Sequence, residues 1–132
     1  MSVGLVLVSH SARLAEGLRE LVEQVAQGRV PVGVAAGAAE GALGTNALDI
    51  AAAIESLDAA EGVVVLVDLG SAVLSAETAL DELAPDLRAR VRMADAPFVE
   101  GAVAAAVESS VGSGLDAVLA TAEAARALGK LA

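Results

Sequence analysis

Two short apolar runs constrain the fold of this chain more than any other feature. Residues 3–8 read VGLVLV and residues 62–67 read GVVVLV, so neither run has a polar residue on either face. Strands with one solvent-exposed face usually alternate apolar and polar residues, whereas strands buried on both faces read as continuous Val, Ile and Leu. Helices must therefore cover both faces of the sheet that contains these two runs.

Segments with helical periodicity separate the apolar runs. Residues 11–28 place leucines and valines at helical spacing, with charged side chains on the opposite face. Ser11 is a candidate N-cap for this helix, and Gly28 is suited to close it. We predict further helices over residues 47–57, 71–83, 96–110 and 114–128, and strands over residues 3–8, 30–37, 62–70 and 90–95.

This alternation of strands and helices indicates parallel strands joined by right-handed crossovers. We predict a small doubly wound α/β fold, with a mainly parallel sheet of about four strands in the order 2-1-3-4 and about five flanking helices. No linker or internal repeat divides the sequence. Residues 1–132 are therefore expected to form one domain.

The composition narrows the classes of function. The mean hydropathy is +0.68, but the uncharged stretches are shorter than the roughly 18–20 residues that span a membrane. No basic segment precedes the first apolar run, so we expect no signal peptide and a cytoplasmic protein. The absence of cysteine excludes disulfides and thiolate metal sites. A net charge of −10 with Phe98 as the one aromatic residue argues against nucleic acid and favours a positively charged protein partner.

Polar residues collect where the first three predicted strands lead into helices. Ligands of open α/β sheets bind at this edge, and the free N–H groups of the helices that begin there favour anions. We therefore take the small polar residues of these loops as candidate phosphate contacts. They are Ser9, Ser11, Thr45, Asn46, Gly70 and Ser71.

His10 and Asp68 are the candidate catalytic residues at this edge. His10 is the only histidine, and the strands that precede the two residues are neighbours in the predicted order. A carboxylate beside the imidazole would fix its tautomer and leave one nitrogen lone pair free for nucleophilic attack. A phosphoryl group is the ligand that best fits such a nucleophile among helix N-termini. Taken singly, His10 and Asp68 also have an ordinary interpretation as helix caps or surface groups. Arg13, in the first turn of the predicted helix, has one as a solvated charge.

The chain lacks the residues that several classes of nucleotide-binding proteins and hydrolases require. The only lysine is Lys130, so there is no Walker loop, and no GxGxxG follows the first strand. A phospho-aspartate receiver would need acidic residues after the first strand, and a serine hydrolase would need a GxSxG elbow. We expect no bound cofactor and no metal.

Four stretches of the sequence resemble a known family in the same order along the chain. They are LVLVSHSARLAEGL, GTNALDIAAAI, GVVVLVDLGSAVLSAETAL and DAPFVEGAVAAAV. Together they resemble the mannose-type IIA domain of the bacterial sugar phosphotransferase system (PTS), and more closely the DhaM phosphoryl-donor subunits of dihydroxyacetone kinases. Sugar-transporting relatives usually carry a Gly-Gly-Ser-Pro-like segment after the aspartate, where this chain has residues 69–72, LGSA.

The resemblance implies a mechanism and partners. His10 would accept a phosphoryl group from the phosphohistidine of HPr and pass it to ADP held by DhaL, with DhaK acting downstream on dihydroxyacetone. Asp68 matches the aspartate that orients the histidine in this family. Such domains are commonly homodimers.

Three other functions remain open from the sequence. The chain could be the IIA component of a mannose-type sugar transporter, or a regulatory domain whose phosphorylation state a partner reads. The first strand and SHSAR also resemble small tetrapyrrole chelatases, but those enzymes need a second histidine, which this chain lacks.

Overall fold

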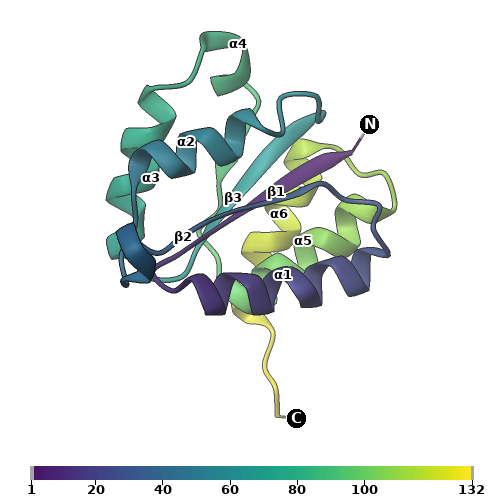
Figure 1. Ribbon diagram of the computed structural model, residues 1–132. Coiled ribbons are helices and arrows are strands. Elements are labelled where there is room, and N and C mark those ends of the chain that lie inside the picture. Colours follow the sequence, from purple (N-terminus) through teal and green to yellow (C-terminus); the bar gives the residue numbers. More distant parts are fainter. Residues whose placement is uncertain (1, 132) are drawn as a thin grey trace.

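The computed structural model describes residues 2–131 and shows a four-stranded sheet with helices on both faces (Figure 1). The strands are β1 (Val3–Ser9), β2 (Val32–Ala36), β3 (Gly62–Val67) and β4 (Val91–Met93). Their order is β2-β1-β3-β4, and every pair is parallel. The predicted α/β class, parallel pairing and strand order are confirmed. β2, β3 and β4 are shorter than the predicted segments 30–37, 62–70 and 90–95.

Within residues 2–131, six α-helices and two short 3₁₀ helices connect or follow the strands. The α-helices are α1 (Ala12–Ala26), α2 (Ala47–Glu55), α3 (Ser71–Asp81), α4 (Pro85–Arg88), α5 (Phe98–Ser110) and α6 (Leu115–Ala124), and the 3₁₀ helices are η1 (Ala39–Gly41) and η2 (Ala125–Ala127). The predicted helix number of about five missed α4. This helix is a single turn with Pro85 in its first turn, and four residues are too few to show a helical period.

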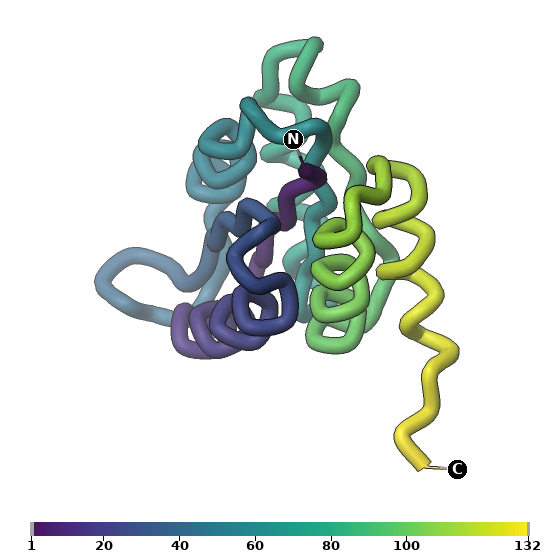
Figure 2. Tube along the Cα trace, turned by 90° about the vertical axis from the view of Figure 1, so that its right-hand side faces the viewer, coloured from purple at the N-terminus to yellow at the C-terminus, as the bar shows by residue number. Residues whose placement is uncertain are grey.

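The two apolar runs are buried on both faces, as their composition predicts. Along β1, the side chains of Leu5 and Leu7 pack with α1, α5 and α6, whereas Val6 and Val8 pack with α2 and α3 on the opposite face. Figures 1 and 2 show these helix layers on either side of the sheet. A shift of one residue in the pairing would exchange the side chains that face the two helix layers.

Local capping sets where the helices begin and end. The Ser11 side chain accepts a hydrogen bond from Leu14 N and caps α1, as predicted. Asn46, rather than Thr45, caps α2 by accepting bonds from the N–H groups of its second and third residues. Gln27 is the C-cap of α1 and has a left-handed backbone with φ of 53°, and Gly28 follows with φ of 72°.

One glycine lies where a helix packs closely against the sheet. Gly101 lies on α5, where an added Cβ would come within 3.1 Å of Leu66 Cδ2 on β3 and 3.0 Å of Ala96 Cβ. α5 therefore approaches the centre of the sheet closely because this position has no side chain. Among residues 2–131, no helix is long and apolar enough to cross a membrane.

Candidate functional site

Three loops meet at the carboxyl edge of the sheet, at the lower left of Figure 1. His10 opens the β1–α1 connection, and Asp68 opens the β3–α3 connection, which follows the neighbouring strand. The segment before α2 joins them, because Gly44 N donates to His10 O at 2.9 Å. A bond of 2.8 Å between Thr45 Oγ1 and Ser75 Oγ ties the same segment to α3. The backbone thus fixes the site before any ligand arrives.

The Asp68 carboxylate is the centre of the hydrogen-bond network. Its Oδ2 accepts from the His10 backbone N at 2.9 Å and from Ser9 Oγ at 3.0 Å. Its Oδ1 lies 2.9 Å from His10 Nδ1 and accepts from Leu69 N at 2.7 Å. The Asp68 side chain is only 7% exposed. Asp68 therefore holds His10 through both its backbone and its ring, and does not serve as a cap of α3.

These contacts shift the pKa of Asp68. Burial on its own would raise the pKa of this carboxyl group. The hydrogen bonds from the His10 backbone, the His10 ring, Ser9 and Leu69 outweigh burial, and the pKa lies below its ordinary value. Asp68 is therefore ionised at neutral pH and acts only as an acceptor.

This ionised acceptor determines the tautomer of His10. Because Asp68 Oδ1 only accepts, Nδ1 carries the ring proton and Nε2 carries the lone pair. The Ser71 hydroxyl lies 2.9 Å from Nε2 and donates to that lone pair. The His10 side chain is 25% exposed, so an incoming group reaches the ring without a rearrangement of the fold.

The candidate phosphate contacts fall into two groups. Ser71 is bonded to His10 Nε2, and Gly70 next to it is exposed at the start of α3. Ser9 has no exposed surface, and its hydroxyl donates to Asp68 and accepts from Ser11 N at 3.0 Å. It lies behind the carboxylate, out of reach of a phosphoryl group, and this placement differs from the contact we expected.

The remaining three candidates are engaged in local structure. Ser11 and Asn46 use their side-chain oxygens to cap α1 and α2. Thr45 is joined to Ser75, a residue that the sequence interpretation did not consider. These three residues shape the walls of the site, while Ser71 is the hydroxyl bonded to the ring.

Five exposed leucines, which we call the leucine rim, adjoin the site. Three of them donate a backbone N–H to a side chain of the site: Leu69 to Asp68, Leu14 to Ser11 and Leu48 to Asn46. The other two, Leu43 and Leu74, directly precede Gly44 and Ser75 in the sequence. Their exposed fractions run from 45% for Leu14 to 77% for Leu43. The sequence interpretation missed the rim, although Leu48 and Leu74 stand off the buried stripes of their helices.

A hollow of about 330 Å³ opens on the β4 side of the site. Its walls include Asp68, Leu69 and Gly70 from the β3–α3 connection, together with Val73 and Met93. The segment that positions His10 is therefore also one wall of a mainly apolar recess. Within residues 2–131, no group of three or more His, Cys, Asp or Glu side chains is arranged to hold a metal ion.

Comparison with known proteins identifies the family. The family described as EIIA-man, PTS system fructose IIA component, matches residues 4–119. The phosphoryl donor subunit DhaM of the PEP-dependent dihydroxyacetone kinase of Klebsiella michiganensis is 47% identical over 120 residues, which cover 89% of this chain and 25% of that protein. The DhaM subunit of dihydroxyacetone kinase 2 of Listeria innocua is 43% identical over 117 residues, which cover 89% of this chain and 94% of that protein.

A solved structure shares the fold of this chain. The crystal structure of protein EF1359, described as of unknown function, has a TM-score of 0.84 and 36% identity, covering 93% of this chain and 94% of that one. This chain spans about a quarter of the length of the Klebsiella relative, and nearly all of the length of the Listeria one. The chain therefore belongs to the EIIA-man family of the phosphotransferase system, in the branch of the DhaM phosphoryl donor subunits.

Proposed function

We propose that this chain is the phosphoryl donor subunit of a PEP-dependent dihydroxyacetone kinase and that His10 carries the phosphoryl group. The donor is the phosphohistidine of HPr, and the acceptor is ADP bound on DhaL, which works with DhaK on dihydroxyacetone. The observation that carries the proposal is the His10 ring, held at Nδ1 by Asp68 and presenting Nε2 beside Ser71. The names of the DhaM relatives support the choice of reaction.

The first transfer balances without moving a proton. The lone pair of His10 Nε2 attacks the phosphorus atom of the donor phosphohistidine, and the donor P–N bond breaks as the new N–P bond forms. The donor imidazole returns to its neutral form, while the His10 ring keeps its Nδ1 proton and becomes positively charged. Asp68, at 2.9 Å from Nδ1, stabilises that charge.

The second transfer reverses the charge change. A β-phosphate oxygen of ADP attacks the same phosphorus atom, the N–P bond of His10 breaks, and ATP forms on the acceptor subunit. His10 returns to the neutral form with its proton still on Nδ1. Positioning and charge stabilisation supply most of the catalysis in phosphoryl transfer, so a fixed ring in a partly open site is sufficient.

Ser71 and the start of α3 are the groups nearest to the transferred phosphoryl. Before transfer the Ser71 hydroxyl bonds to Nε2, and when phosphorus occupies that position the hydroxyl is free to donate to a phosphoryl oxygen. Backbone N–H groups at the N-terminus of α3 favour the same negative charge. A site that bound the phosphoryl group too tightly would trap it, so light stabilisation suits onward transfer.

The leucine rim suits the docking of carrier proteins. Both partners must bring a reacting atom to Nε2, so each must cover the loops that hold His10. Five exposed leucines on these loops give apolar contact area at the centre of such an interface, where binding energy concentrates. The net charge of −10 favours partners with positive surfaces and speeds their encounter.

The same proposal includes the state of the protein in the cell. Residues 1–132 act as one domain, as a homodimer, in the cytoplasm where the phosphocarrier proteins are found. The PTS family match supports this part of the proposal.

A sugar-transport role is the second candidate, because the matching family is described as a fructose IIA component. In that role His10 would pass its phosphoryl group to a sugar-specific transporter component instead of ADP. Residues 69–72, LGSA, favour the dihydroxyacetone branch. The two candidates share the first transfer and differ only in the acceptor.

Intact-mass measurement of phosphoryl transfer tests the proposal. The protein is mixed with enzyme I, HPr and phosphoenolpyruvate, and we expect an acid-labile gain of one phosphate that is absent from His10→Ala. ADP-loaded DhaL is then added, and we expect the phosphate to leave and ATP to form. Gain without loss to DhaL would favour the sugar-transport candidate, and no gain would overturn both.

A further inference from the structure

Ser9 is the last residue of β1, and it has no exposed surface. Within residues 2–131, Ser9 and Ser109 are the two buried polar residues. A buried hydroxyl costs free energy unless it is hydrogen-bonded, so the partners of such a group indicate what it does. Ser109 donates to Val3 O at 2.6 Å and so serves the backbone of β1, whereas Ser9 donates to the carboxylate that holds His10.

The backbone of Ser9 is fixed by the sheet. Ser9 pairs with Ala36 of β2, and Gly37 N donates to Ser9 O at 3.1 Å. On the other side of β1, Asp68 N donates to Val8 O at 3.0 Å. Strand pairing therefore sets where the Ser9 hydroxyl lies relative to the Asp68 side chain.

The direction of the Ser9 hydroxyl proton follows from its two partners. Ser11 N donates to Ser9 Oγ at 3.0 Å, so the oxygen already accepts one bond. Asp68 Oδ2 lies 3.0 Å from the same oxygen, and an ionised carboxylate only accepts. The hydroxyl proton therefore points to Asp68, and the three groups form a chain in which each bond strengthens the next.

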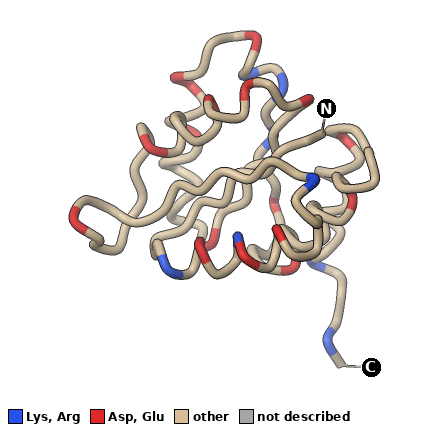
Figure 3. Tube along the Cα trace, turned by 45° about the vertical axis from the view of Figure 1, so that its right-hand side comes forward, with Lys and Arg blue, Asp and Glu red and all other residues tan. Residues whose placement is uncertain are grey.

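The charge of Asp68 is balanced by N–H and O–H donors. The chain has 8 basic and 18 acidic residues, and Figure 3 shows how few Lys and Arg residues stand among the acidic ones. In the part of the chain that the structure describes, the ring of His10 is the only ion-pair partner of Asp68. Each neutral donor to this nearly buried carboxylate therefore matters more than it would beside an arginine.

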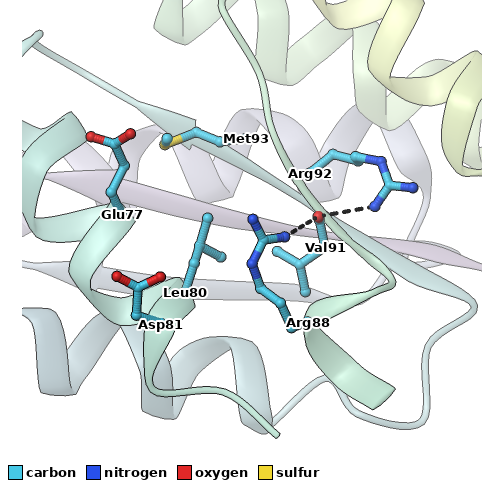
Figure 4. Close-up of a pocket in the computed structure, with 7 residues that line it drawn as sticks. All are labelled: Glu77, Leu80, Asp81, Arg88, Val91, Arg92 and Met93. Atoms are coloured by element: carbon cyan, nitrogen blue, oxygen red, sulfur yellow. Dashed lines mark hydrogen bonds between the residues drawn. The ribbon is translucent and has the colours of Figure 1, made fainter. Parts of the chain in front are cut away.

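The arginines on the β4 side of the site are engaged elsewhere. Arg88 and Arg92 line a cavity that shares Met93 with the hollow beside Asp68 (Figure 4). Their guanidinium groups donate to Val91 O at 3.3 Å and 3.1 Å. These two positive charges are therefore directed at a backbone carbonyl and not at the carboxylate.

The Ser9 hydroxyl is the one side-chain donor to Asp68 other than the His10 ring itself. The remaining donors are the backbone N–H groups of His10 and Leu69. The torsion that turns an aspartate carboxylate has a broad range, so hydrogen bonds must fix the plane of the group. Without the hydroxyl, Oδ2 would keep a single bond, and Oδ1 would be less firmly held toward His10 Nδ1.

We propose that Ser9 is a positioning residue that acts through Asp68. Its hydroxyl, oriented by Ser11 N, fixes the plane of the Asp68 carboxylate and so keeps the ring proton of His10 on Nδ1 and the lone pair on Nε2. The expected effect on the rate rests on the proposed phosphoryl transfer, whereas the expected effect on the tautomer does not. Ser9 thus contributes to the reaction without contacting the phosphoryl group.

Three substitutions separate the hydroxyl from burial and shape. Ser9→Ala removes the hydroxyl, and Ser9→Thr keeps it on a side chain that suits a strand. Ser109→Ala is the matched control, because it removes the other buried serine hydroxyl and its bond at the opposite end of β1. Circular dichroism and urea unfolding first show that the variants are folded.

Nitrogen-15 nuclear magnetic resonance of the neutral His10 ring gives the first readout. We expect the wild type, Ser9→Thr and Ser109→Ala to carry the proton on Nδ1, and Ser9→Ala to show a mixture of the two tautomers. The measurement uses the unphosphorylated protein and needs no partner. An identical tautomer in the wild type and Ser9→Ala would overturn the proposal.

The rate of phosphorylation gives the second readout, with phospho-HPr and with phosphoramidate as donors. We expect Ser9→Ala to be slower by about 10-fold with both, the order expected for one lost hydrogen bond to a charged group. Ser9→Thr and Ser109→Ala should match the wild type. Equal loss in Ser9→Ala and Ser9→Thr would assign the effect to shape and overturn the proposal. If phospho-HPr phosphorylates no protein, including the wild type, the proposed function fails, and the tautomer comparison still decides the role of Ser9.

A measurement on the wild-type protein covers the case in which Ser9→Ala does not fold. The proton of a buried, hydrogen-bonded hydroxyl exchanges slowly with water and gives its own magnetic resonance signal. We expect such a signal for Ser9, close in space to the amide proton of Ser11. A Ser9 hydroxyl proton that exchanges too fast to be observed would show that the hydroxyl is not held, and the proposal would be wrong.

Discussion

His10 and Asp68 are joined twice. The ring Nδ1 of His10 lies 2.9 Å from Asp68 Oδ1, and the backbone N of His10 donates to Asp68 Oδ2, also at 2.9 Å. The carboxylate therefore sets both the position of the loop and the orientation of the imidazole. A substitution at Asp68 affects the tautomer and the loop together.

Asp68→Asn should slow phosphorylation of His10 by about 100-fold or more, because the amide nitrogen of Asn cannot accept the bonds that the carboxylate accepts, and the ring loses its preferred tautomer. Rapid-quench measurement of transfer from phospho-HPr gives the rate. Asp116→Asn on α6 is the matched control, because Asp116 is exposed and has no part in the site. A rate for Asp68→Asn within about twofold of the control would reduce Asp68 to a structural role.

Ser71→Ala should slow transfer by about 10-fold, the order expected when one hydrogen bond to a charged group is lost. Ser71→Thr keeps the hydroxyl and should restore most of the rate. The comparison is made under single-turnover conditions, so that binding of HPr and the transfer step are separated. If Ser71→Ala and Ser71→Thr were equally slow, the shape of the residue and not its hydroxyl would be responsible.

Leu69→Ser combined with Leu74→Ser should weaken transfer from phospho-HPr by about 10-fold or more, because apolar contacts at the centre of an interface supply much of its affinity. Phosphorylation by phosphoramidate, a small donor that needs no docking surface, should be unchanged. Leu128→Ser is the control, since Leu128 is 66% exposed near the end of the chain. Equal loss with both donors would mean that the substitutions damage the site itself.

Acid should destabilise the protein partly through Asp68. The pKa of Asp68 is lower in the folded protein, so its contacts contribute stability that is fully present above the unfolded-state pKa, about 4. This contribution is lost as the pH falls through the lower folded-state pKa. We expect the difference in unfolding free energy between wild type and Asp68→Asn, measured by urea denaturation, to shrink below about pH 4. A difference that stays constant with pH would contradict the assignment.

Gly101→Val should lower the free energy of unfolding by about 1–3 kcal/mol, because the new side chain would overlap Leu66 and Ala96 in a packed core. Gly17→Val on α1 is the matched control, since an added Cβ there meets nothing within 4 Å. The change in the free energy of unfolding, measured by thermal and urea denaturation, should differ between the two variants in sign or clearly in size. Similar losses in both would show that the backbone of Gly101, and not its close packing, is what matters.

The fold could be predicted from the sequence because the two continuous apolar runs are both the strongest pattern in the sequence and the physical reason for the fold. The continuous runs ending at Val8 and Val67 could be satisfied only between two layers of helices, and the crossovers then fixed the parallel order. The ends of β2 and β4 could not be predicted, because they depend on where pairing with the central strands stops. α4 was missed because one helical turn has no period to detect.

The site was predicted in part for a similar reason. His10 and Asp68 end adjacent strands, so the strand order alone brings them together. The position of Ser9 was not predictable, because the last residue of a strand can face either the core or the solvent and its side chain here points inward. The leucine rim was overlooked because exposed and buried leucines look alike until the buried face of each helix is known.

The backbone bonds around His10 have a consequence for how this loop responds to thermal fluctuation. The His10 amide donates to a nearly buried carboxylate, and Asp68 N donates to Val8 O at 3.0 Å, so the loop continues the ladder of the two central strands. Its amide hydrogens should then exchange with solvent about as slowly as those of β1 and β3, rather than at the rate of an ordinary surface loop. Reactivity and global unfolding are coupled in such an arrangement, and a destabilised molecule would lose its nucleophile only when the centre of the sheet itself opens.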